Sequence, residues 1–129
     1  MERTARKILV IDDDERHLVA AKGLLEDAGY EVVTHNHWIG STSAVMKLKP
    51  DLVLLDINMP ALSGDRLSML FRTNGSTRNV PVVFYSSNDE DSLRKSALKC
   101  GVAGYICKGD VFELRRKVGF YLDTACRET

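Results

Sequence analysis

Short apolar runs alternate with longer amphipathic stretches along the whole chain. Three runs, residues 8–11, 52–55 and 82–85, are continuous rather than alternating in apolar character. Continuous runs of this length are typical of strands that are buried on both faces, as in a parallel sheet. Two weaker runs, residues 31–34 and 104–107, predict edge strands or shorter strands.

Between these runs, apolar residues recur at helical spacing. The clearest case begins at Leu18, where Ala21 and Leu25 continue the same helical face and Gly29 is a suitable stop. Strands that alternate with helices predict an open parallel sheet with right-handed crossovers, covered by helices on both sides. Further helices are expected around residues 44–48, 67–71, 93–98 and 111–122.

Length and charge narrow the class of protein. The 129 residues fit one domain, and no effector domain is expected within them. The formal net charge of zero gives no indication of direct nucleic-acid binding or of membrane binding. The apolar runs are too short for a signal peptide or a membrane span. Cys100, Cys107 and Cys126 lack metal-ligand spacing and are expected to be reduced thiols in a cytoplasmic protein.

Polar residues follow the carboxyl ends of the expected strands. Asp12 and Asp13 follow the first strand, and Asp56 follows the third. Ser86 and Lys108 follow the fourth and the fifth. Because ligands of open α/β sheets bind at this edge, we expect these side chains to meet there. The set predicts a site in which Asp56 and a cation bind an incoming phosphoryl group. Ser86 and Lys108 would bind the other oxygens of that group.

Clustered carboxylates repel one another unless a cation lies among them. Mg²⁺, or Mn²⁺ in its place, prefers oxygen ligands and needs only one or two carboxylates besides a phosphate. Asp13 and Asp56 are candidate direct ligands, and Asp12 is a direct or water-mediated one. The backbone carbonyl of Asn58 is a further candidate ligand.

The residues at the strand ends also follow a recognisable order, which is Asp12-Asp13, Asp56-x-Asn58-Met59-Pro60, Gly64, Ser86, Gly104-Tyr105 and Lys108. Over essentially the whole chain, this order closely resembles the receiver domain of two-component response regulators. Each motif alone is weakly specific, whereas the set in this order is strongly specific. The resemblance implies a single-domain, flavodoxin-like (βα)5 fold, a doubly wound parallel sheet with strand order 2-1-3-4-5.

The resemblance also implies a role for each matching residue. Asp56 corresponds to the phosphoacceptor, which takes a phosphoryl group from a sensor histidine kinase or a histidine phosphotransfer protein. Ser86 and Tyr105 correspond to the switch residues, and Asn58 and Asn88 to positions that tune dephosphorylation. The implied output is a change on the face of the fourth helix, fifth strand and fifth helix, which a downstream protein would bind. Such a domain catalyses only its own phosphorylation and dephosphorylation.

Two other functions are compatible with parts of this pattern. Asp12-Asp13-Asp14 is similar to the nucleophile motif of haloacid-dehalogenase-type phosphatases, although only Asp110 follows Lys108 where those enzymes have an acidic pair. A pseudo-receiver that binds proteins without being phosphorylated is the third possibility, because Gly109 stands where the receiver family usually has proline.

Two further positions lie outside this pattern. Ser63 stands where an aspartate is common in the receiver family. His17, His35 and His37 are expected on the surface, since an isolated His-x-His without a nearby acid is a poor metal site.

Overall fold

The computed structural model describes residues 6–37, 39–58, 64–75 and 77–127. Met59, Pro60 and Ser63 of the sequence pattern lie outside the described residues, as does the side chain of Cys126. Cys100 and Cys107 are free thiols. Within the described part of the chain, no helix combines the length and the apolar character needed to cross a membrane.

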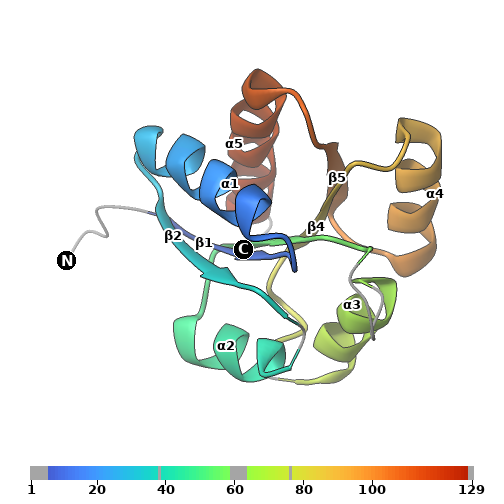
Figure 1. Cartoon of the computed structure of the whole chain (residues 1–129). Coiled ribbons are helices and arrows are strands. Elements are labelled where there is room, and N and C mark those ends of the chain that lie inside the picture. The colour runs from blue at the N-terminus through green and yellow to red at the C-terminus, as the bar shows by residue number, and fades with distance from the viewer. Residues whose placement is uncertain (1–5, 38, 59–63, 76, 128–129) are drawn as a thin grey trace.

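The strands form one parallel sheet in the order β2-β1-β3-β4-β5 (Figure 1). This confirms the doubly wound (βα)5 fold, and the two weaker apolar runs are indeed the edge strands β2 and β5. The elements follow one another as β1 (Lys7–Ile11), α1 (Glu15–Asp27), β2 (Glu31–His35), α2 (Ser41–Leu48), β3 (Leu52–Leu55), α3 (Gly64–Thr73), β4 (Val82–Ser86), α4 (Glu90–Cys100), β5 (Gly104–Cys107) and α5 (Val111–Arg127).

Residues of each inner strand alternate between two cores, one on each face of the sheet. Ile8 and Val10 of β1 pack with residues of α1 and α5. Leu9 and Ile11 of the same strand pack with residues of α2, α3 and α4. Figure 1 shows α1 and α5 above the sheet and α2 and α3 below it. Because both faces are buried, an inner strand needs apolar residues at every position, which explains the continuous runs.

Local signals in the sequence set the ends of α1. Asp14 is the N-cap, and its carboxylate accepts a hydrogen bond from the backbone N–H of Arg16 at 2.9 Å. Gly29 follows the last turn with a φ of 98°, in the left-handed region that favours glycine. The start of α1 therefore lies directly after the acidic end of β1, which holds the first helical turn close to Asp12 and Asp13.

Replacing Gly104 or Gly23 by alanine should change the free energy of unfolding in opposite directions. A Cβ atom at Gly104 would lie 2.0 Å from the hydroxyl oxygen of Tyr121. Gly104→Ala should therefore lower the free energy of unfolding by about 1–3 kcal/mol. Gly23→Ala, within α1, meets nothing within 4 Å and should raise it by about 0.5–1 kcal/mol. Urea denaturation measures both values, and a Gly104→Ala protein as stable as the wild type would contradict this packing.

Candidate functional site

The carboxyl ends of β1, β3, β4 and β5 bring polar residues to one edge of the sheet. The first residue after a strand is held there by backbone hydrogen bonds that continue the sheet ladder. The N–H of Asp56 donates to the carbonyl of Ile11 at 3.0 Å, and that of Lys108 to the carbonyl of Ser86 at 2.9 Å. The strand register therefore places each of these residues at the edge, as the sequence predicts.

Three carboxylates meet at this edge. One oxygen each from Asp12, Asp13 and Asp56 lies within 4.8 Å of the other two. Asp12 is 1% exposed and Asp56 is 7% exposed, whereas Asp13 is open to solvent. The cluster therefore has two buried members and one side that a ligand can approach.

The ammonium group of Lys108 lies beside the buried carboxylates. Its Nζ atom is 2.5 Å from Oδ2 of Asp12 and 3.4 Å from Oδ2 of Asp56. It is also 2.8 Å from Nδ1 of His17. Because the Lys108 side chain is only 10% exposed, solvent screens these contacts weakly. Its charge offsets part of the repulsion between the two carboxylates.

Burial raises the pKa of the Asp56 carboxyl above its usual range. The neighbouring Asp12 carboxylate acts in the same direction, whereas the backbone N–H of Asn58 and the Lys108 ammonium oppose it. Burial also raises the pKa of Tyr85, and Asp12 adds to that rise. Negative charge at this edge is therefore unfavourable in the absence of a further cation.

Asn58 links the candidate acceptor to Ser86. Its backbone N–H donates to Oδ1 of Asp56 at 3.0 Å. Its side-chain amide donates to Oγ of the fully buried Ser86 at 2.9 Å and to Oδ1 of Asn88 at 2.6 Å. In this structure the Ser86 hydroxyl is thus an acceptor for Asn58, and the polar residues predicted after β3 and β4 form one connected group.

Tyr105 belongs to a different part of the surface. It lines a groove of about 300 Å³ between α4 and α5, together with Leu98 and Tyr121. The Tyr121 hydroxyl accepts from the backbone N–H of Tyr105 at 3.2 Å and donates to its carbonyl at 3.3 Å. The Nζ atom of Lys117 lies 5.0 Å from the centre of the Tyr105 ring. The aromatic ring predicted as a switch is therefore placed in the α4–α5 groove.

Gly109 forms the turn after Lys108 with a φ of 112°. Non-glycine residues rarely adopt this angle. Glycine therefore makes this turn, at the position where the family usually has proline.

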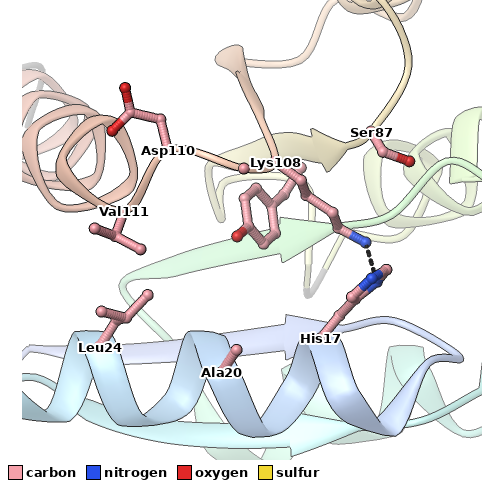
Figure 2. Close-up of a pocket in the computed structure, with 9 residues that line it drawn as sticks. His17, Ala20, Leu24, Ser87, Lys108, Asp110 and Val111 are labelled. Atoms are coloured by element: carbon pink, nitrogen blue, oxygen red, sulfur yellow. Dashed lines mark hydrogen bonds between the residues drawn. The ribbon is translucent and has the colours of Figure 1, made fainter.

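A cavity of about 370 Å³ lies between this turn and α1 (Figure 2). The residues that line it include His17, Ala20, Leu24, Lys108, Gly109 and Val111.

His17 is predicted from the sequence to be a surface residue, but it lies at the site. Its side chain is 42% exposed, and Figure 2 shows the ring directed at the Lys108 ammonium. Its Nδ1 atom is 3.4 Å from Oδ2 of Asp12, and its Nε2 atom is 3.7 Å from Oδ2 of Asp14. A sequence signal existed, because residues three apart share a helix face and His17 lies three residues after the N-cap Asp14.

Residues 8–118 match the response regulator receiver domain family, and the chain belongs to this family. The polar-differentiation response regulator DivK of Brucella anthropi is 25% identical over 107 residues, which cover 80% of this chain and 84% of DivK. Protein RcaC of Microchaete diplosiphon is 29% identical over 102 residues, which cover 79% of this chain but 16% of RcaC. The chain thus spans most of one relative and a small part of another.

Solved structures share the fold. A CheY-like response regulator receiver domain protein from Methanospirillum hungatei superposes with a TM-score of 0.82 at 25% identity, covering 97% of this chain and 99% of that one. The receiver domain of a sensor histidine kinase from Pseudomonas aeruginosa also superposes with a TM-score of 0.82, at 22% identity. The superposition covers 92% of this chain and 98% of that receiver domain. That structure contains a magnesium ion coordinated in its active site cleft.

The raised pKa of Asp56 predicts a pH-dependent effect of Asp56→Asn. Because folding favours the neutral acid, the stability from this group is present at low pH and is lost as pH rises through the folded-state pKa. Asp56→Asn removes that loss, so without divalent cations it should raise the free energy of unfolding by about 1 kcal/mol at about pH 7.5. The gain should shrink towards about pH 4.5. Urea denaturation at both pH values measures it.

The matched control is Asp123→Asn, at an exposed aspartate of α5. It should change stability by no more than about 0.5 kcal/mol at either pH. Destabilisation by Asp56→Asn at the higher pH would mean that attraction to Lys108 outweighs the burial of the carboxylate.

Proposed function

We propose that this chain is a divalent-cation-dependent phosphoacceptor domain of two-component signalling, with Asp56 as the acceptor. One observation carries the proposal. The buried Asp56 lies at the sheet edge with oxygens of Asp12 and Asp13 within 4.8 Å and the Lys108 ammonium 3.4 Å away. A carboxylate nucleophile, a set of cation ligands and a fixed positive charge are the groups that phosphoryl transfer to an aspartate requires.

The donor set suits Mg²⁺ or Mn²⁺. Asp12, Asp13 and Asp56 supply carboxylate oxygens, and the exposure of Asp13 leaves room for bound water and a phosphoryl oxygen. The backbone carbonyl of Asn58 is a further ligand in this proposal. The bound ion would supply charge neutralisation during transfer. The magnesium ion in the Pseudomonas aeruginosa receiver domain, which has the same fold, supports this assignment.

The transfer itself needs little covalent chemistry from the protein. In a histidine kinase or a histidine phosphotransfer protein, the N–P bond of phosphohistidine breaks as an Asp56 oxygen forms the new O–P bond. Lys108 donates to a phosphoryl oxygen, and Ser86 turns its hydroxyl from Asn58 towards another. In this proposal Asn58 and Asn88, joined by a hydrogen bond beside Ser86, tune the later hydrolysis of the acyl phosphate by water.

Incubation with acetyl phosphate and Mg²⁺ tests the acceptor. Mass spectrometry should show the addition of one phosphoryl group, which hydroxylamine removes and which Asp56→Asn abolishes. Asp13→Ala should raise the Mg²⁺ concentration for half-maximal labelling at least about tenfold, because it removes a charged ligand. The Asp123→Asn protein, changed far from the strand ends, should label like the wild type.

Other results of the acetyl phosphate experiment would indicate a different function or a different ligand set. Steady hydrolysis of a phosphomonoester without a labelled protein would indicate a phosphatase of the haloacid-dehalogenase type. No labelling at any Mg²⁺ concentration would indicate a pseudo-receiver. An unchanged Mg²⁺ requirement in Asp13→Ala would contradict the ligand assignment of Asp13 alone.

We further propose that the output surface is the face formed by α4, β5 and α5. The groove on this face contains Tyr105, and Leu98 at its rim is 76% exposed. The two hydrogen bonds between Tyr121 and the Tyr105 backbone connect β5 to α5. A movement of Ser86 at the end of β4 can reach Tyr105 through the paired strands, since Phe84 of β4 pairs with Tyr105 of β5. An exposed apolar groove suits an unidentified downstream protein.

Amide NMR spectra with beryllofluoride and Mg²⁺, which stand in for the phosphoryl group and its cation, test this route. Signals of the α4–β5–α5 face, including Leu98, Tyr105 and Tyr121, should shift together with those at Asp56. In Ser86→Ala the shifts on that face should fall to less than about half, while those beside Asp56 persist. Shifts confined to the strand ends in the wild type would contradict this output surface.

A further inference from the structure

We propose that His17 is a positioning residue that holds the Lys108 ammonium in its resting place and thereby opposes the phosphorylated state. This inference rests on the proposed function of Asp56. His17 comes from the first turns of α1 and Lys108 from the end of β5, so only the fold brings them together. Figure 2 shows the His17 ring and the Lys108 side chain directed at each other at one end of the cavity.

Acceptors on three residues surround the ammonium group of Lys108. A lysine ammonium has three hydrogens to donate. Three acceptor atoms surround it here, on Asp12 at 2.5 Å, on His17 at 2.8 Å and on Asp56 at 3.4 Å. The two short contacts are to Asp12, which directly follows β1, and to His17 of α1, and the long one is to the proposed acceptor Asp56. Lys108 is therefore held more closely by Asp12 and His17 than by Asp56.

The contact with Lys108 also defines the tautomer of His17. An ammonium group can only donate, so Nδ1 of His17 accepts and carries no hydrogen. The ring hydrogen is then on Nε2, which lies 3.7 Å from Oδ2 of Asp14. Asp14 is itself held by its hydrogen bonds with Arg16. The N-cap of α1 thus favours the tautomer in which Nδ1 is available to Lys108.

A phosphoryl group on Asp56 would change the partners of Lys108. In this proposal Lys108 then donates to a phosphoryl oxygen, and the movement of its Nζ atom towards that oxygen lengthens its contacts with the nearer acceptors. Asp12 has another partner in that state, because it belongs to the proposed cation ligands. His17 is a nitrogen acceptor outside this oxygen set, and it keeps competing for Lys108 after the cation has bound. The contact between His17 and Lys108 is therefore lost only at the step that occupies Asp56.

Removal of this acceptor should stabilise the state that resembles phosphorylation. In His17→Leu, the apparent dissociation constant for beryllofluoride at saturating Mg²⁺ should fall roughly three- to tenfold, the range of one net hydrogen bond. His17→Asn is the matched variant, because its amide oxygen can occupy the position of Nδ1. It should bind within about twofold of the wild type. Titrations followed by amide NMR, all at the same pH, measure the three proteins.

His17→Leu in a Lys108→Met background tests whether His17 changes beryllofluoride affinity through Lys108. Because His17 acts only through the ammonium, His17→Leu should change beryllofluoride affinity less than about twofold in that background. An equal gain in both backgrounds would overturn the proposal, as would weaker binding by His17→Leu or an Asn variant that behaves like Leu. Urea denaturation of each variant separates these results from a loss of folding.

Failure of the proposed function gives a different result. If the wild type binds no beryllofluoride with Mg²⁺, the assignment of Asp56 as acceptor is wrong. If the wild type binds and His17→Leu binds with the same affinity, the acceptor assignment stands and the positioning role of His17 is wrong.

Discussion

Repulsion among the carboxylates of Asp12, Asp13 and Asp56 is the constraint on which the rest of the site depends. Two of these groups are buried, and the folded chain keeps them close by backbone hydrogen bonds that continue the sheet. The positive charge of Lys108 reduces the repulsion between the carboxylates of Asp12 and Asp56. A divalent cation would neutralise the remaining negative charge. Burial raises the pKa of Asp56 and the Asp12 carboxylate adds to that rise, so a cation at this edge would offset unfavourable negative charge.

The architecture explains why the chemistry is confined to this edge. Both faces of the sheet are covered by helices and filled with apolar side chains, so the polar groups of the site lie at or just beyond the carboxyl ends of the inner strands. Parallel strands all end on the same side, which places residues after β1, β3, β4 and β5 together. Backbone hydrogen bonds hold Asp56 and Lys108 at this edge.

Several features followed from the sequence because they depend on short-range physics. The stop at Gly29 acts within a few residues, and continuous apolar runs mark strands buried on both faces. The polar residues at the strand ends followed from the apolar runs that precede them, whereas the strand order followed from the resemblance to the receiver family. The position of His17 did not follow, because its partner Lys108 lies 91 residues away and on another element. Tyr105 was placed at a strand end, but its groove is formed by α4 and α5.

The sequence by itself determined the elements, the candidate acceptor Asp56 and the residues around it, because each is marked by local patterns or by a fixed order along the chain. Only the tertiary structure decided how the Lys108 ammonium is shared among Asp12, His17 and Asp56. Only it showed that the Asn58 amide joins Ser86 to Asn88, and that Gly109 makes its turn with a positive φ. Hydrogen bonds between distant elements depend on distances of a few tenths of an ångström, which packing sets and residue order does not encode.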